Sequence, residues 1–235
     1  MKTKCIFFTV IAIYSILVSF TLTAQDFFIK AKIGPIDEIE VFNGAFYEIY
    51  KPKPLYPSSI SVSSTLAHTS NRYKKEHLID QNPKTAWVEG IKGNGINEKI
   101  RFIFKNSIAP PDVISFIPGY MRSEKKWFKN NRISKIKVSI LTHPIEGNEL
   151  IGSVTLTIPK DSTGRILPEI YSVNLNYIYL QNMLVSEFGV VEIEILEVDS
   201  IDSKYEDTCI SEVHFFITDK IIKQMSIKDY EKRKN

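Results

Sequence analysis

The sequence has little of what several large protein classes require. It contains two cysteines in 235 residues, too few for a disulfide-rich scaffold, and neither lies in a CxxC or Cys/His zinc spacing. Its formal net charge is only +3 and its basic residues are scattered, whereas a dedicated nucleic-acid binder has a basic stripe or a far more basic balance. Ten glycines and 11 prolines argue against a collagen-like or low-complexity chain. The remaining composition, 43% hydrophobic and 24% charged, favours one globular domain.

The one long apolar run lies at the N-terminus. Lys2 and Lys4 precede an apolar run over residues 6–20, and small residues ending at Ala24 follow it. This is the pattern of a secretory signal peptide, and the run is shorter than the roughly 20 residues that a membrane-spanning helix needs. We therefore expect residues 1–24 to be removed, leaving no stable membrane span. The mature protein is then secreted, or held in the periplasm or cell envelope. An uncleaved N-terminal anchor is the alternative.

The rest of the chain has the hydrophobic period of β-strands. Ile100, Phe102 and Phe104 occupy alternate positions, and they alternate with Lys99, Arg101 and Ile103. The same alternation recurs over residues 135–140, 150–156 and 191–195, and turn-forming residues bound each run. Half-buried strands at this spacing predict an all-β fold, an antiparallel sandwich or barrel with one face of each sheet on the core. The only short stretches with helical character are 74–78 and the tail after Asp219.

The two ends of the mature chain differ from its middle. We interpret residues 25–56 as an N-terminal extension with one or two strands and a proline-rich connector, because proline cannot donate to a β-ladder. Residues 57–218 form the predicted sandwich domain. Residues 219–235 are rich in charge and are interpreted as a solvated, helical C-terminal tail.

Six landmarks between these ends carry a resemblance to a known family. In chain order they are Ser63-Ser64-Thr65-Leu66, the segment 78–90, Gly93-Asn94-Gly95-Ile96, the segment 118–123, Asn130-Asn131-Arg132 and the segment 205–212. Their order and spacing resemble the discoidin-like (coagulation factor five/eight type C) domains, in the branch found beside bacterial NAD glycohydrolases. The resemblance implies a galactose-binding-like jelly-roll sandwich that binds a ligand and has no catalytic role. Pro118 stands where the branch usually has asparagine, so the ligand's identity is not carried over.

The segment from Asp80 to Thr85 offers hard oxygen donors in a proline-turned loop, which suits calcium better than zinc. In the discoidin-like sugar modules, the matching loop and a carboxylate of the last strand hold a structural cation. The resemblance thus implies one calcium ion held by Asp80, Asn82, Thr85 and Glu212. The alternative is that Asp80 and Thr85 only cap turns through hydrogen bonds to the backbone.

A second group of residues is the predicted ligand-binding site. Aromatic rings stack on the apolar face of a sugar, and arginine and asparagine bind its hydroxyl groups. The set consists of Tyr120, Arg122, Trp127, Asn131 and Arg132. Charged neighbours on both sides of Trp127 predict an exposed indole in a loop, whereas the other tryptophan, Trp87, is expected in the core. The alternative is that Arg132 pairs with a structural carboxylate such as Asp207 and that the aromatic rings close the sandwich.

No pattern in the sequence supports catalysis. The four histidines show no HExxH spacing, and neither a GxSxG nucleophile elbow nor a P-loop occurs. Cys209, in an apolar strand, is expected to be a buried inert thiol. We therefore expect an exported, non-catalytic module that binds a glycan or a glycosylated surface, with no cofactor besides calcium. A module for protein–protein interaction or envelope assembly, using the same loop edge, is the alternative.

Overall fold

The computed structural model describes residues 28–31, 39–43, 46–68, 70, 72–105, 109–143, 147–175 and 188–224. The predicted signal peptide, residues 1–24, and the end of the predicted tail, residues 225–235, lie outside the described residues. Within this described part, no helix combines the length and the apolar character that crossing a membrane requires.

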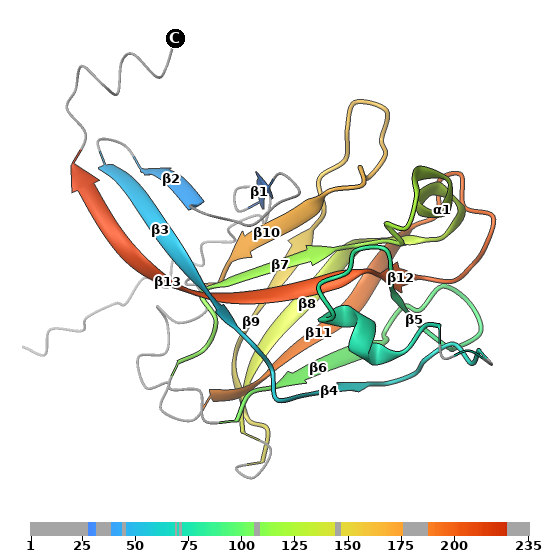
Figure 1. Ribbon diagram of the computed structural model, residues 1–235, viewed down its shortest axis with the longest axis horizontal. Helices are drawn as coiled ribbons and strands as arrows, with labels where there is room; N and C mark the ends of the chain where they lie inside the picture. Colours follow the sequence, from blue (N-terminus) through green and yellow to red (C-terminus); the bar gives the residue numbers. More distant parts are fainter. Residues whose placement is uncertain are drawn as a thin grey trace, which may run out of the picture.

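Two antiparallel sheets pack face to face (Figure 1). The six-stranded sheet has the order β1 (Phe28–Ala31), β10 (Ile170–Asn174), β7 (Val113–Ile117), β13 (Glu212–Gln224), β3 (Phe46–Leu55), β2 (Ile39–Asn43). The five-stranded sheet has the order β4 (Ser59–Val62), β6 (Lys99–Ile103), β11 (Phe188–Asp199), β8 (Arg132–Thr142), β9 (Leu150–Thr157). A two-stranded ladder joins β12 (Cys209–Ile210) to β5 (Trp87–Val88). The predicted all-β jelly-roll sandwich is confirmed.

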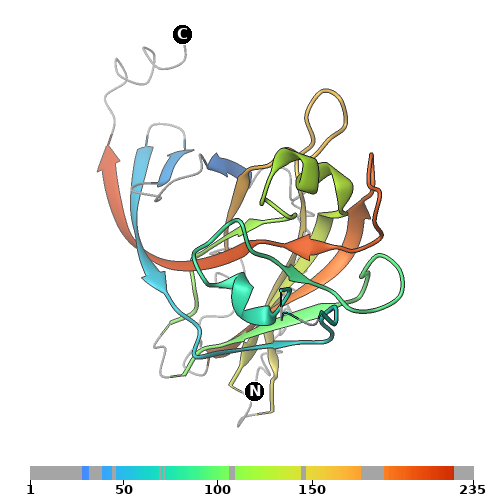
Figure 2. The ribbon, with the colours of Figure 1, turned by 45° about the vertical axis from the view of Figure 1, so that its right-hand side comes forward.

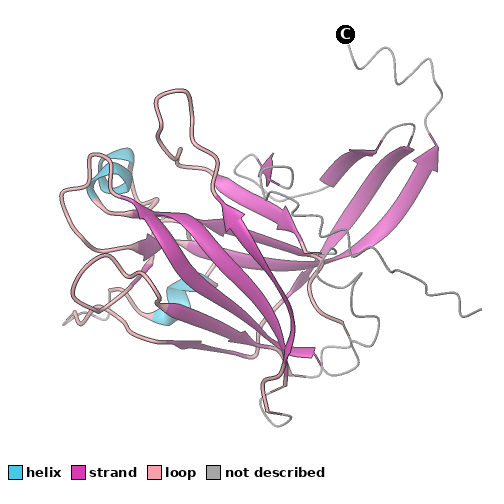
Figure 3. Ribbon diagram, turned by 180° about the vertical axis from the view of Figure 1, so that it is seen from behind, coloured by secondary structure: helices cyan, strands magenta, loops and turns pink. Residues whose placement is uncertain are grey.

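The helical content is small. A 3-10 helix, η2, covers Lys75–Leu78, close to the predicted stretch 74–78. One short α-helix, α1, covers Glu124–Lys129, where the sequence predicted a loop. Both helices lie at the same end of the sandwich (Figure 3).

The strand register explains why hydrophobic and charged residues alternate along the strands. Ile193 of β11 lies opposite Ile100 on one neighbour and Val138 on the other, and all three side chains are buried. The preceding residue, Glu192, is paired with Arg101, and Arg101 Nε lies 2.6 Å from its carboxylate. In β6 and this part of β11, one parity therefore builds the core, while the other carries charge pairs on the outer face.

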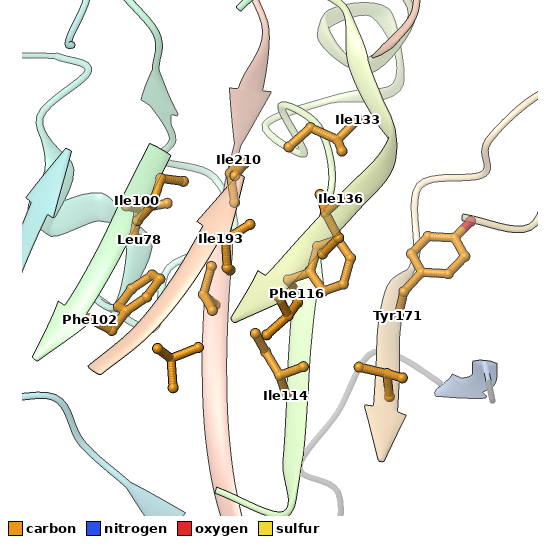
Figure 4. Packing of buried hydrophobic residues seen from close by; sticks show 14 of the residues in the cluster. Leu78, Ile100, Phe102, Ile114, Phe116, Ile133, Ile136, Tyr171, Ile193 and Ile210 are labelled. Atoms are coloured by element: carbon orange, nitrogen blue, oxygen red, sulfur yellow. The ribbon is translucent and has the colours of Figure 1, made fainter. Parts of the chain in front are cut away.

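The core fills the space between the two sheets. Phe215 of β13 contacts Phe102 across the sandwich, with ring centroids 4.8 Å apart, and Phe104, with centroids 5.2 Å apart. Figure 4 shows the same arrangement elsewhere, with Ile114 and Phe116 of β7 among the aliphatic side chains of the opposite sheet. Because the described chain contains no disulfide and its one described cysteine is free, burial of this cluster is the main source of stability.

The N-terminal extension is part of the sheet. β3 pairs with β13 from Phe46↔Gln224 to Leu55↔Phe215, so residues 51–55 form a strand and not a free connector. β2 covers the other side of β3 only as far as Tyr50. Pro52 and Pro54 lie beyond that point. Among the described residues, this part of β3 has a strand partner on one side only. Proline, which has no backbone N–H, is tolerated in such a one-sided part of a strand.

The helical interpretation of the tail is wrong for residues 219–224. These residues are the end of β13, and Asp219 lies opposite Lys51 in the ladder with β3. The local sequence is polar and helix-compatible, but pairing with a distant strand overrides that local preference.

Candidate functional site at the loop end of the sandwich

Five connections gather at one end of the sandwich, which we call the loop end: residues 63–68 with 72–74, 89–98, 118–131, 158–169 and 200–207 (Figure 2). Hydrogen bonds tie these connections to one another. Thr208 Oγ1 donates to the carbonyl oxygen of Asn94 over 2.7 Å, and the backbone N–H of Tyr205 donates to Lys129 over 2.9 Å. The loop end is therefore a joined surface and not a set of separate loops.

Trp127 is not exposed, and the predicted indole platform is wrong. The residue lies on α1, its side chain is fully buried, and its Nε1 donates to the carbonyl oxygen of Ile166 over 3.0 Å. Ser123 caps the helix by accepting from the backbone N–H of Lys126. A helix turns about 100° per residue, so Lys125, two residues before Trp127, lies on the opposite side of α1 and faces solvent while Trp127 points inward.

Arg132 is also internal, as the structural alternative predicted, but its partner differs. Its Nη2 lies 3.1 Å from Asp199 Oδ2, and both side chains are buried. Its Nη1 donates to the carbonyl oxygens of Trp127 and Asn130. The guanidinium therefore fastens the end of α1 to the end of β11, and Asp207, the carboxylate expected from the sequence, is not its partner.

The other three predicted ligand-binding residues have different positions. Asn131 is buried, and its Nδ2 donates to the carbonyl oxygen of Glu206 over 2.7 Å. Tyr120 is 4% exposed and lies beneath the surface. Arg122 is exposed. Of the five predicted residues, only Arg122 can reach a ligand without rearrangement.

A partly exposed aromatic group that the sequence did not predict packs against Tyr120. The ring of Tyr73 packs edge-on against Tyr120, with centroids 6.4 Å apart, and against His68 on its other side, with centroids 5.5 Å apart. Leu66 and Tyr73 rest on a small cluster of Ala86, Val88, Tyr120 and Cys209. We call the exposed His68, the half-buried Tyr73 and the exposed Arg122, which follows Tyr120 by two residues in the chain, the loop-end aromatic surface. Nothing in the local sequence around His68 and Tyr73 marks them, because only the folding of their loop over β5 places them there.

Glu89 anchors the loop over residues 89–98. Its side chain is 1% exposed, and its carboxylate accepts from the backbone N–H groups of Ile91, over 2.8 Å, and Thr208, over 3.4 Å. Gly95 has φ of +72°, and a Cβ there would lie 2.6 Å from Cγ of Glu89. Burial raises the pKa of Glu89, and the negative charges of Asp207 and Glu98 raise it further.

The predicted cation residues come together at the side of the sandwich. Asp80 Oδ1 and Glu212 Oε1 both accept from the backbone N–H of Asn82, over 3.0 and 2.6 Å. Thr85 Oγ1 donates to both carboxylate oxygens of Asp80. The Asn82 side chain accepts from the N–H of Lys84 in its own turn. The predicted turn caps are therefore real, and Glu212 of β13 joins them.

The donor set at this position fits a hard cation in its chemistry. Glu212 Oε2 is buried and accepts no hydrogen bond, a cost that a bound cation would remove. Burial and the hydrogen bond with Asp80 raise the pKa of Glu212 to about 8, so at neutral pH it keeps its proton. Burial also acts to raise the pKa of Asp80, but hydrogen bonds from His77, Glu212 and Thr85 outweigh it and lower that pKa. Among the described residues, no cluster of three or more His, Cys, Asp and Glu side chains is arranged to hold a metal.

The fold and these positions agree with a sequence-family match. Residues 50–216 match the model of the NAD glycohydrolase translocation F5/8 type C domain. The chain belongs to this family. The predicted discoidin-like resemblance is confirmed, and the matched domain type is a translocation domain and not a catalytic one.

Three solved structures show the range of similar folds. CBM32-3 of a family 31 glycoside hydrolase from Clostridium perfringens is 14% identical, with a TM-score of 0.48 over 69% of this chain and 94% of that chain. CBM32-5 from Clostridium perfringens, in complex with GalNAc-β-1,3-galactose, is 14% identical, with a TM-score of 0.46 over 68% and 94%. An F5/8 type C domain from Bacteroides fragilis is 14% identical, with a TM-score of 0.41 over 77% and 97%. No curated protein matches the chain.

Proposed function

We propose that this F5/8 type C domain is an exported, non-catalytic module that binds carbohydrate at its loop-end aromatic surface. The observation that supports the proposal is the half-buried ring of Tyr73, which packs against the buried Tyr120 and the exposed His68, with the exposed Arg122 two residues after Tyr120 in the chain. An aromatic ring that is already fixed loses little entropy when a sugar stacks on it, and an exposed guanidinium can donate to two hydroxyl groups. On this surface Ser70 Oγ lies 2.8 Å from His68 Nδ1 in an exposed loop, and the thiol of Cys209 is buried. The non-catalytic part of the proposal is supported by the match to a translocation domain.

A glycan array tests this proposal, followed by calorimetry with the best ligand. Arg122→Ala should weaken binding by about tenfold, as expected when one charged hydrogen-bonding side chain of ~1.4 kcal/mol is lost. Because Arg122 is exposed, the Arg122→Ala variant should have the same melting temperature as the wild type. Tyr56→Ala is the matched control, since this tyrosine is 65% exposed and lies where β3 turns into β4, away from the loop end. Full affinity in Arg122→Ala and in Tyr73→Ala would contradict this placement of the site.

Binding of a partner protein is a second candidate function, supported by a different observation. Ile91 and Ile96 are 43% and 36% exposed on the loop over residues 89–98, and Ile201 and Tyr205 are 42% and 40% exposed on the neighbouring connection. Exposed apolar side chains that gather on joined loops suit a protein interface. An Ile91→Ser, Ile96→Ser double variant should lose a protein partner but retain a glycan, so it separates the two candidates.

We also propose one structural calcium ion at the side of the sandwich. Asp80, Asn82, Thr85 and Glu212 would hold it, and its charge would replace the proton that Glu212 carries. Calcium should then raise the melting temperature by mass action, relative to chelator. Glu212→Gln should abolish the rise, whereas Asp161→Asn, which alters an acidic turn elsewhere, should retain it. Equal melting curves in calcium and in chelator would leave only the turn-capping role.

Export is the remaining part of the proposal. Its support is the sequence pattern of residues 1–24, with a basic start, a short apolar run and small residues before Gln25. N-terminal sequencing of protein recovered from outside the cytoplasm should begin close to Gln25. An intact Met1 in a membrane fraction would favour the anchored form instead.

A further inference from the structure

The outer edge of β9 has the geometry of an unused pairing surface. β9 is the last strand of the five-stranded sheet and pairs with β8 alone among the described strands (Figure 3). The backbone N–H of Ile158 donates to Ser134 of β8 over 2.8 Å, which sets the phase of the ladder. Since backbone groups alternate in direction along a strand, those of Ser153, Thr155 and Thr157 point away from β8. These three residues present donors and acceptors to a further strand.

Other exposed edges of this domain carry protection that the regular part of β9, residues 153–157, lacks. At the opposite edge of the same sheet, β4 has four residues, and Lys75 Nζ donates to the carbonyl oxygen of Ile60 over 2.7 Å. Pro52 and Pro54 occupy the one-sided part of β3. The ladder of β9 with β8 has a register shift between Leu150 and Gly152. Beyond that irregularity, β9 reads SVTLT over residues 153–157, in regular register and with neither a proline nor a charge. Proteins commonly use lysine, proline, bulges or short length to prevent edge pairing, so this regular segment points to a partner strand.

The edge is complementary to itself. In an antiparallel arrangement centred on Thr155, Thr155 faces Thr155 of the second copy and Ser153 faces Thr157 of the second copy. These hydroxyl-bearing side chains are exposed in the monomer, and Thr–Thr and Ser–Thr pairs across strands are favourable. On the core side, the half-buried Val154 would be covered.

Charge does not oppose this pairing. Lys135 and Lys137 of β8 are the nearest charged residues and lie opposite Thr157 and Thr155. In the paired arrangement, each Lys137 would be three strand spacings, about 14 Å, from its counterpart. That distance exceeds the screening length of about 8 Å at physiological salt.

We propose that two copies of this domain associate through antiparallel pairing of β9, which joins their five-stranded sheets into one continuous sheet. The inference does not depend on what the loop end binds. The two-fold axis of the dimer lies at Thr155, because pairing in that register uses the outward backbone groups of all three edge residues.

Sedimentation velocity over a range of concentrations, on the chain recovered after export, tests the association. A dimer is expected, and Thr155→Lys should raise its dissociation constant at least about tenfold, because two lysines then face each other across the axis. Ser59→Lys is the matched control at the exposed edge of β4 and should leave the constant unchanged. A monomer at every concentration, or equal dimerisation in Thr155→Lys, would overturn the proposal.

Single cysteine variants test the register and do not depend on the folding of the lysine variant. Thr155→Cys should form a covalent dimer on oxidation, because Cα atoms of facing residues are about 5.5 Å apart, within disulfide range. Thr157→Cys alone should not, since it faces Ser153, but a mixture of Thr157→Cys with Ser153→Cys should. The native Cys209 is buried and does not interfere. If Thr157→Cys formed a covalent dimer by itself and Thr155→Cys did not, the proposed register would be wrong.

Discussion

Replacing Trp127 with alanine removes one of the two largest fully buried side chains. Truncation of a buried tryptophan typically costs about 3–5 kcal/mol, and the carbonyl oxygen of Ile166 also loses the hydrogen bond from Nε1. For a domain of this size, each kcal/mol shifts the melting temperature by roughly 2–4 °C. The expected fall is therefore about 6–20 °C, a large part of an ordinary stability of about 5–15 kcal/mol.

Thermal and urea unfolding of Trp127→Ala, beside binding to the best array ligand, measures this effect. Lys125→Ala is the matched control, because it alters the exposed face of the same helix and should leave the melting temperature unchanged. Gly119→Ala should also destabilise the domain, since its added Cβ would lie 2.8 Å from the indole. An unchanged melting temperature with lost ligand affinity in Trp127→Ala would refute the buried position and restore the exposed platform predicted from the sequence.

Three further outcomes follow from the buried polar groups. Arg132→Met should cost about 3–5 kcal/mol in urea unfolding, because it leaves the buried Asp199 without its main partner; a cost below ~1 kcal/mol would contradict the buried pair. Burial raises the pKa of Glu89 in the folded protein above the ordinary 4.5. As the pH rises, Glu89 therefore loses its proton in the unfolded protein before it does so in the folded protein. The contribution of protonated Glu89 to stability is thus lost as the pH rises from about 4.5 through the raised folded pKa. The urea midpoint of wild type relative to Glu89→Gln should accordingly be lower at pH 8 than at pH 5, and a constant difference would show that Glu89 is solvated. Because burial raises the pKa of the Cys209 thiol, iodoacetamide should label it only in urea, as followed by mass spectrometry, and rapid labelling of the native protein would show that β12 opens.

The strands could be predicted from the sequence because burial on one face imposes a period of two. Ile100 and Phe102 point into the core, and the acidic residues of β11 lie on the outer face as their parity predicts. Glu192 is nevertheless an ion-pair partner of Lys99 and Arg101 and not a freely solvated charge. Parity indicates the face of a residue, but the neighbouring strand decides its partners.

The positions of the residues predicted to bind a ligand were harder to derive from the sequence, for two physical reasons. A six-residue helix is too short to show a clear helical period, so the charges around Trp127 suggested a loop and an exposed ring. The partner of Arg132 lies 67 positions away, a separation over which sequence spacing carries no information. The proximity of Asp80, Asn82, Thr85 and Glu212 was easier to predict, because the first three lie in one turn and only Glu212 had to come from elsewhere. Whether they hold a cation stays a prediction.

The central place of β13 determines when this domain can fold. β13 lies between β7 and β3, so the six-stranded sheet stays in two parts until the last strand arrives. Without Phe215, the rings of Phe102 and Phe104 also lack a shared neighbour across the core. Because pairing distant segments of a chain pays a large loop-closure cost before any contact rewards it, a chain in which β13 has not yet paired cannot complete this core. The six-stranded sheet and the core beneath it therefore close in one late step, when β13 pairs with both β7 and β3.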